Sequence, residues 1–178
     1  MNLSITSDDC IFIMVDIQER LIDAMQDRDL LLKNAVILNK ATEILTIPLV
    51  VTEQYPERLG KSVIDYPEKH QYFSKTRFSI FTDEATEYIK NLEKPILVVY
   101  GIEAHICVTQ TCLDAIQQGY HVLLVTDAIS SRKEYSKEIA LKMLSDKGVE
   151  LVTTEMILFR FLKDAKHPHF KEISKLIK

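Results

Sequence analysis

Glycine and cysteine are both scarce in this 178-residue chain, which has four glycines and three cysteines. The glycines are too far apart to spell G-x-G-x-x-G or a P-loop, which excludes the enzymes that cradle phosphates in a Gly-rich loop. Three cysteines cannot all pair within one chain, so we interpret Cys10, Cys107 and Cys112 as reduced thiols in a reducing compartment. Each of them is then either a small buried side chain or a reactive centre.

A basic surface and a long apolar segment are also lacking. The formal net charge is −4, and no run of 18 apolar residues occurs. The acidic balance argues against a nucleic-acid partner, because neutralising phosphates requires a basic surface. The missing apolar run argues against a membrane partner. Residues 1–9 do not show the basic stretch and apolar core of a signal peptide, so we expect a cytoplasmic protein.

Short apolar runs rich in β-branched residues alternate with segments of helical periodicity. The runs are typical of strands buried on both faces of a parallel sheet. They occupy residues 11–15, 48–52, 95–100, 121–126 and 149–153, and a further strand is indicated near 71–73. The helical segments are 30–45, 84–92, 107–118 and 134–147. No linker or repeat divides the chain, so we predict one α/β domain over residues 1–178.

Polar side chains follow several of these strands at their carboxyl ends. Asp16 follows the first strand, Lys75 follows the segment near 71–73, and Cys107 opens the helix after strand 95–100. In open α/β sheets, ligands bind outside the carboxyl ends of the strands, where the strand order reverses. If the first and fourth strands flank that reversal, Asp16 and Cys107 face one crevice.

Cys107 lies in the predicted first turn of a helix, after a strand and a tight loop. Unpaired N–H groups and the positive end of the helix dipole favour a thiolate there, and a nearby Lys75 ammonium favours it further. The alternative is a buried packing role, which we favour for Cys10 and Cys112. His105 lies two residues before Cys107, but sequence adjacency is a poor guide to catalytic pairing. We therefore interpret His105 as a residue that shapes the loop.

Three sequence blocks resemble the isochorismatase-like cysteine hydrolases. They are MVDIQ at 14–18, FSKTRFS at 73–79 and GIEAHICVTQTCLDA at 101–115, the last followed by DAISSR at 127–132. The blocks occur in the order and at the spacing of that family, and DAKHPHFKEI at 164–173 resembles its isochorismatase-domain-containing subgroup. The resemblance implies a three-layer α/β/α sandwich around a Rossmann-like, six-stranded parallel sheet.

The resemblance also implies a catalytic triad of Asp16, Lys75 and Cys107. In this hypothesis Asp16 takes the thiol proton, and Cys107 attacks the carbonyl carbon of a small amide-like substrate to form a thioester that water hydrolyses. The family's usual cis peptide bond between the residues at Ile102 and Glu103 would turn N–H groups of the loop, including that of Cys107, toward the oxyanion.

The zinc site of nicotinamidase relatives has no counterpart in this sequence. Those relatives carry Asp-x-His after the second strand, whereas this chain has Gln54 and Pro56, neither of which is a zinc ligand. His167 and His169 lack further ligands nearby, and we interpret them as part of a surface loop at the start of a helix. We therefore expect no metal and no other cofactor.

Four residues flank the predicted strand ends and are candidates for binding a small-molecule substrate: Gln18, Tyr55, Phe78 and His105. Gln18 is equally suited to bonding its own loop backbone. Two other functions stay open, namely a vinyl-ether hydrolase of the isochorismatase type and a non-catalytic redox or binding module in which Cys107 is oxidised. Apolar surface on segments 30–45 and 157–162 indicates a homo-oligomer, either a dimer or a tetramer.

Overall fold

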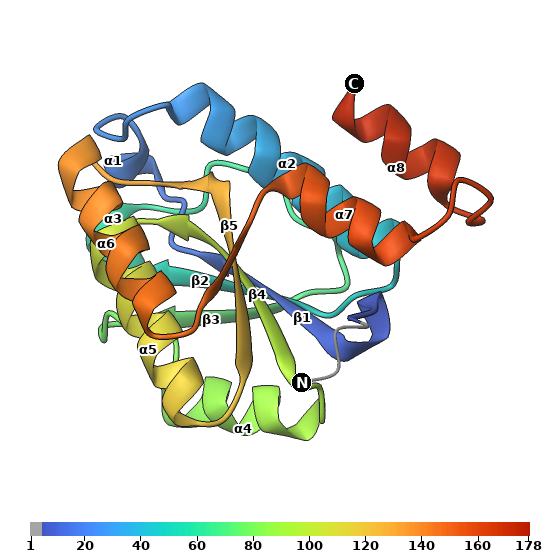
Figure 1. The fold of residues 1–178 in the computed structure, drawn as a ribbon. Coiled ribbons are helices and arrows are strands. Elements are labelled where there is room, and N and C mark those ends of the chain that lie inside the picture. The colour runs from blue at the N-terminus through green and yellow to red at the C-terminus, as the bar shows by residue number, and fades with distance from the viewer. Residues whose placement is uncertain (1–4) are drawn as a thin grey trace.

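Six parallel strands form one sheet through the middle of the molecule in this computed structural model (Figure 1). The structure describes residues 5–178, and the first four residues of the N-terminal segment judged above to lack a signal peptide lie outside that range. The sheet order is β3-β2-β1-β4-β5-β6, with every neighbouring pair parallel. The strands are β1 (Cys10–Val15), β2 (Leu49–Gln54), β3 (Gln71–Lys75), β4 (Ile96–Ile102), β5 (His121–Ser130) and β6 (Glu150–Val152).

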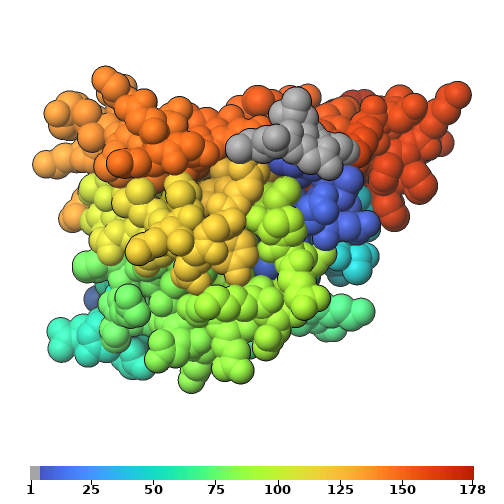
Figure 2. Space-filling view, turned by 60° about the horizontal axis from the view of Figure 1, so that its bottom comes forward, coloured from blue at the N-terminus to red at the C-terminus, as the bar shows by residue number. Residues whose placement is uncertain are grey.

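Helices cover both faces of the sheet, which confirms the predicted three-layer α/β/α sandwich (Figure 1). One face carries α2 (Arg28–Ile44), α7 (Thr154–Leu162) and α8 (Phe170–Ile177). The other carries α4 (Asp83–Asn91), α5 (Thr109–Gln117) and α6 (Glu134–Asp146), which colour the view in Figure 2 from green to orange. Shorter turns are η1 (Ser7–Asp9), α1 (Glu19–Ile22), α3 (Pro56–Leu59) and η2 (Ala104–Val108).

The predicted elements agree with the observed ones where the apolar pattern is regular. The segments predicted at 30–45, 84–92 and 134–147 correspond to α2, α4 and α6 within two residues at each end. The segment predicted at 107–118 begins instead as the π-helical turn η2 and continues as α5. None of the helices within residues 5–178 is both long enough and apolar enough to cross a bilayer.

The core lies along the central strands. Every residue of β1, β2 and β4 is buried, as expected of strands covered by helices on both sides. The fully buried Tyr100 of β4 donates its hydroxyl hydrogen bond to Asn39 Oδ1 of α2 at 2.7 Å. Among the described residues, every buried side-chain nitrogen and oxygen has a hydrogen-bond partner.

The strand order reverses between β1 and β4, which are hydrogen-bonded neighbours. The prediction that the first and fourth strands flank the reversal is therefore confirmed. Val15 at the end of β1 lies beside Gly101 of β4, and a Cβ atom at Gly101 would come within 2.1 Å of the Val15 carbonyl oxygen. Gly101 also has a φ of +123°, so only glycine permits this close approach. The tight contact places Asp16 beside the loop that leads to Cys107.

Candidate active site

The carboxyl ends of β1, β2 and β3 bring a buried ion pair together. Asp16 follows β1, and Lys75 is the last residue of β3. Asp16 Oδ2 accepts a hydrogen bond from Lys75 Nζ at 2.6 Å, and neither side chain is exposed. Between them lies β2, whose Thr52 hydroxyl donates to Asp16 Oδ1 at 2.8 Å. The carboxylate thus has a partner on each oxygen.

The Lys75 ammonium has acceptors for all three of its hydrogens. Besides Asp16 it donates to Gln54 Oε1 at 2.8 Å and to the Phe78 carbonyl oxygen at 3.0 Å, with the Arg77 carbonyl oxygen at 3.3 Å. An ammonium held in this way supplies a fixed positive charge. Lys75 therefore acts on its surroundings through its field, since its hydrogen bonds are already in use.

Asp16 sits in an unusual backbone conformation with φ of +51°, and its N–H donates to the Thr52 carbonyl oxygen at 3.1 Å. Burial raises the pKa of this carboxyl, while the Lys75 charge and the hydrogen bonds from Lys75, Thr52 and Cys107 oppose the rise. A carboxylate whose pKa is raised is a better proton acceptor than an exposed one. The geometry therefore suits Asp16 to proton transfer.

Cys107 lies in η2 and is 6% exposed, with its thiol hydrogen-bonded to Asp16. Burial and the Asp16 charge raise the pKa of the thiol to about 12, against the opposing charge of Lys75. Lys75 lowers the pKa of the thiol, as predicted, but burial and the Asp16 charge outweigh it. The reason is that Cys107 precedes α5 in a buried π-helical turn, where desolvation outweighs the nearby positive charge.

The loop before Cys107 contains a cis peptide bond between Ile102 and Glu103. The backbone amide of Glu103 hydrogen-bonds the Cys107 sulfur. The Glu103 carbonyl oxygen accepts from the N–H groups of Ile106 at 3.0 Å and Val108 at 3.2 Å. A π-helical turn of this kind is frequent at functional sites. Glu103 thereby ties the loop to the thiol and to the turn that carries it.

Replacing Lys75 by methionine is expected to lower the free energy of unfolding by about 3–5 kcal/mol, because the change leaves the Asp16 carboxylate buried without its counter-charge. Urea denaturation measures the loss. Adding Asp16→Asn to Lys75→Met removes the unpaired charge and restores part of the stability. Lys90→Met, on the exposed surface of α4, is the matched control and changes stability by less than about 0.5 kcal/mol. A loss at Lys75 no larger than the control's contradicts the prediction.

Comparison with known proteins identifies the architecture around these residues. The sequence profile of the isochorismatase domain matches residues 10–156. The chain belongs to the isochorismatase family. Isochorismatase domain-containing protein 2 of Danio rerio is 38% identical over 169 residues, which cover 94% of this chain and 86% of that protein. The resemblance inferred from the three sequence blocks is confirmed.

Solved structures agree with this assignment. The structure of MAR1 ribonuclease from Caenorhabditis elegans is 33% identical, covers 97% of this chain and 91% of its own, and superposes with a TM-score of 0.93. YcaC from Escherichia coli, described as an octameric hydrolase of unknown specificity, is 20% identical, covers 99% of this chain and 96% of its own, and has a TM-score of 0.89. The second likeness concerns the fold alone.

Gln54 and Pro56, which occupy the positions compared above with the zinc ligands of nicotinamidase relatives, have structural contacts. Gln54 holds Lys75 with its Oε1 and donates its amide to the Thr76 carbonyl oxygen at 2.6 Å. Pro56 is the first residue of α3. Within residues 5–178, no three His, Cys, Asp or Glu side chains gather closely enough to hold a metal ion. The Gln54 side chain is thus a structural partner of the ammonium.

Both the nitrogen and the oxygen of the Gln18 side-chain amide are hydrogen-bonded to backbone groups. Its Nε2 donates to the carbonyl oxygens of Gln54 at 3.0 Å and Gly60 at 2.7 Å, and its Oε1 accepts from Gln54 N–H at 2.7 Å. The side chain is fully buried. Of the two roles considered for Gln18, the observed contacts are those of loop fixation.

The other three candidates for substrate binding lie close in sequence to the strand ends that carry Asp16, Lys75 and Cys107, and they differ in exposure. Tyr55 and Phe78 are 42% and 50% exposed, and Arg58 lies 5.5 Å from the centre of the Tyr55 ring. Phe78 contributes its carbonyl oxygen to Lys75. His105 Nδ1 lies 2.9 Å from the Ser131 hydroxyl, away from any pairing with the thiol. The contacts of His105 agree with a loop-shaping role.

The sequence did not reveal the roles of two residues in the candidate active site. Thr52 was placed in a strand without a role, and Arg132 was noted only as part of a family block, yet Thr52 bonds Asp16 and Arg132 bonds Glu103. The polar residue at the end of the apolar run 48–52 is the signal that could have pointed to Thr52. Arg132 is positioned by the loop that contains Glu103, which local sequence does not reveal.

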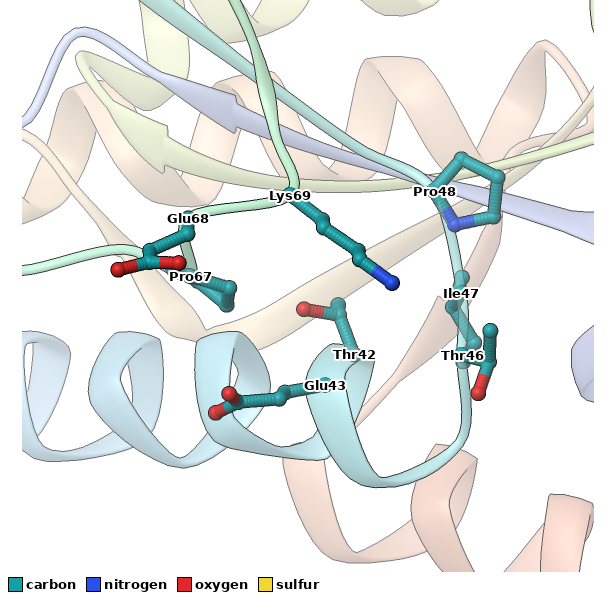
Figure 3. A pocket seen from close by; sticks show the side chains of 8 residues that line it. All are labelled: Thr42, Glu43, Thr46, Ile47, Pro48, Pro67, Glu68 and Lys69. Carbon is teal, nitrogen blue, oxygen red and sulfur yellow. The ribbon is translucent and has the colours of Figure 1, made fainter.

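A separate hollow of about 400 Å³ lies near the amino end of β2, remote from the triad in the strand direction (Figure 3). Lys69 extends across it from the segment before β3, above Thr42 of α2 (Figure 3). Its lining is made of Thr42, Glu43, Thr46, Ile47, Pro48, Pro67, Glu68 and Lys69. None of the candidate catalytic residues contributes to it.

Proposed function

We propose that the protein is a metal-independent cysteine hydrolase that cleaves the C–N bond of a small amide-like substrate. The observation that carries this proposal is the contact between the Cys107 thiol and Asp16, whose carboxylate is paired with Lys75. A nucleophile beside a base, with the base held by a third group, is the arrangement that activates a weak nucleophile. Membership of the isochorismatase-like hydrolase family supports it.

In the proposed first half-reaction the Cys107 sulfur attacks the amide carbonyl carbon as its proton passes to Asp16. The C–N bond of the tetrahedral intermediate then breaks, and Asp16 returns the proton to the leaving amine, which gives a thioester and an ionised Asp16. The raised pKa of Asp16 makes its carboxylate a better proton acceptor than that of an exposed aspartate, and the leaving amine, which is far more basic than a carboxylate, takes the proton back.

In the second half-reaction a water molecule attacks the thioester while Asp16 takes one of its protons. The C–S bond breaks, the acid product leaves, and the proton returns to the Cys107 sulfur. We assign stabilisation of both oxyanions to N–H groups of the loop Ile102, Glu103 and Cys107, which contains the cis peptide bond. The fixed charge of Lys75 keeps Asp16 ionised between the transfers.

Three other functions are weighed against the same geometry. A vinyl-ether hydrolase would use Asp16 as an acid, and analysis of the products formed from isochorismate separates it from an amidase. A redox sensor needs a thiolate, which the raised pKa of Cys107 opposes. A ribonuclease, the activity in the name of the Caenorhabditis elegans relative, must place a polyanion at a thiol that is 6% exposed in a chain of net charge −4.

A panel of small primary amides, with isochorismate and a single-stranded RNA oligonucleotide beside them, tests the proposal. Ammonia release from an amide, together with an intact-protein mass shift equal to the acyl group on Cys107, is the expected result. Hydrolysis of isochorismate without an adduct on the protein supports the vinyl-ether hydrolase instead. Cleavage of the RNA supports the ribonuclease.

We further propose that the protein is cytoplasmic and self-associates. All three cysteines are free and buried, which fits a reducing compartment. The apolar segments 30–45 and 157–162 lie mostly in the core, whereas Tyr135, Ile139 and Met143 form an exposed stripe along α6. The octameric assembly described for YcaC supports a second copy of this chain as the partner.

A two-fold pairing of α6 helices is self-complementary. Antiparallel packing about Ile139 sets Tyr135 against Met143 of the second copy and brings Glu138 near the second copy's Lys142. Light scattering coupled to gel filtration is expected to show a dimer or larger assembly. Ile139→Asp is expected to reduce the measured mass to that of one chain, while the control Lys171→Asp on α8 leaves it unchanged. A monomeric unsubstituted protein overturns the proposal.

A further inference from the structure

A basic cavity of about 340 Å³ lies between η2 and the start of α6. It is lined by His105, Arg132, Lys133 and Ser136. Two of these four side chains, Arg132 and Lys133, are cationic, although the chain as a whole carries a net charge of −4. Such a local concentration of positive groups attracts anions against the overall charge.

The cavity adjoins the nucleophile through Glu103. The Glu103 backbone amide bonds the Cys107 sulfur, while Glu103 Oε2 accepts from Arg132 N–H at 3.1 Å and lies 3.3 Å from Arg132 Nε. His105, on the cavity wall, stands two residues before Cys107 in the same π-helical turn. The wall of the cavity and the turn that carries the sulfur therefore share His105, and Glu103 joins Arg132 to that turn.

The contact with Glu103 leaves the two terminal nitrogens of the Arg132 guanidinium available to a ligand. Glu103 takes Nε and the backbone N–H, and within residues 5–178 neither terminal guanidinium nitrogen has another acceptor. Two parallel N–H groups on a guanidinium match the two oxygens of a carboxylate. Lys133, exposed at the cavity wall, adds a second full charge, and Ser136 adds a hydroxyl donor.

We propose that this cavity is the subsite for a carboxylate on the substrate, so that the amide cleaved at Cys107 belongs to a molecule that also bears an anionic group. The identification of the substrate class rests on the proposed amide hydrolysis, but the anion subsite itself does not. Arg132 binds the carboxylate through its fork, Lys133 raises the local concentration of anions, and the Glu103 carboxylate holds Arg132 in position.

A pair of alkylating reagents tests the subsite without any turnover. Iodoacetate and iodoacetamide both transfer a substituted methylene group to the Cys107 sulfur with loss of iodide, and they differ in a carboxylate against a neutral amide. The rate ratio of iodoacetate to iodoacetamide at Cys107, read by peptide mass spectrometry, is expected to exceed the ratio on glutathione by at least about tenfold and to fall as salt is added. A ratio equal to that on glutathione overturns the proposal.

Variants separate recognition from structural damage. Arg132→Gln and Lys133→Gln are each expected to lower the iodoacetate-to-iodoacetamide ratio severalfold, while Lys147→Gln at the exposed far end of α6 keeps it. Damage to the loop alone moves both rates together and leaves the ratio of the variant at its original value, which contradicts the assignment of Arg132.

Binding of malonate to the unsubstituted protein, measured by calorimetry, provides a second readout that needs no reactive thiol. We expect binding that weakens at least about tenfold in Arg132→Gln. The amide panel then gives the link to catalysis, because succinamate should be hydrolysed with a lower KM than succinamide. If neither amide is hydrolysed but the iodoacetate-to-iodoacetamide ratio is as expected, the proposed reaction is wrong and the subsite stands. If the two amides have equal KM values and malonate does not bind, the subsite is wrong.

Discussion

Cys107→Ser is expected to lower kcat/KM on the best amide of the panel by at least about 10³-fold. A serine hydroxyl fits the same space, so the buried turn of η2 is kept. The hydroxyl is a much weaker nucleophile than a thiol, and the Asp16 carboxylate is too weak a base to ionise it. The loss therefore reports the chemical step, and the thioester mass adduct disappears with it.

Cys10→Ser is the matched control for this substitution. The Cys10 thiol is buried like that of Cys107 and donates to the Thr6 carbonyl oxygen at 3.3 Å, a bond that a hydroxyl can also make. We expect the control to keep hydrolysis within a few-fold of the original rate. Full activity of Cys107→Ser on the same amide removes cysteine from the role of nucleophile.

Asp16→Asn is expected to move two reactions of the same thiol in opposite directions. Amide hydrolysis falls by at least about 10³-fold, because the proton acceptor and donor is lost. Alkylation of Cys107 by iodoacetamide near pH 8 becomes faster, because the Asp16 charge and hydrogen bond both raise the pKa of the thiol and Lys75 remains to stabilise a thiolate.

The pH profile of alkylation shows whether the Asp16 charge raises or lowers the pKa of the Cys107 thiol. With its pKa raised to about 12, Cys107 is protonated at neutral pH, so the alkylation rate of the unsubstituted protein should still be rising steeply at pH 9. The asparagine variant should show the same rise at lower pH, because lowering the pKa of the thiol by about one gives about tenfold more thiolate at pH 8. Slower alkylation of the variant at every pH contradicts this account of the Asp16 charge.

The fold could be predicted from the sequence because its strands are continuous apolar runs. A strand buried on both faces leaves a dense β-branched signal, as in β1 and β4, and the helices between such strands keep a regular period. The turns η2 and α3 leave no such signal, since each spans about one turn. The boundary of α5 was missed for that reason.

The site was only partly predictable. Asp16, Lys75 and Cys107 could be named from family blocks, but their protonation depends on desolvation by residues from many parts of the chain. The role of Gln18 was undecidable in sequence because its partners are backbone groups of another strand and loop, which any residue type supplies. Arg132 depends in the same way on a loop 29 residues earlier.

The register of the sheet gives the buried ion pair a consequence for folding. β1 is apolar throughout and β2 is apolar from Leu49 to Val51, so over that stretch a slip of one residue would exchange one buried apolar side chain for another at little hydrophobic cost. The same slip would pull Asp16 away from Thr52 and Lys75 and leave two unpaired charges in the interior. The groups that we assign to catalysis therefore also penalise misaligned pairings of strands that the hydrophobic pattern alone would tolerate.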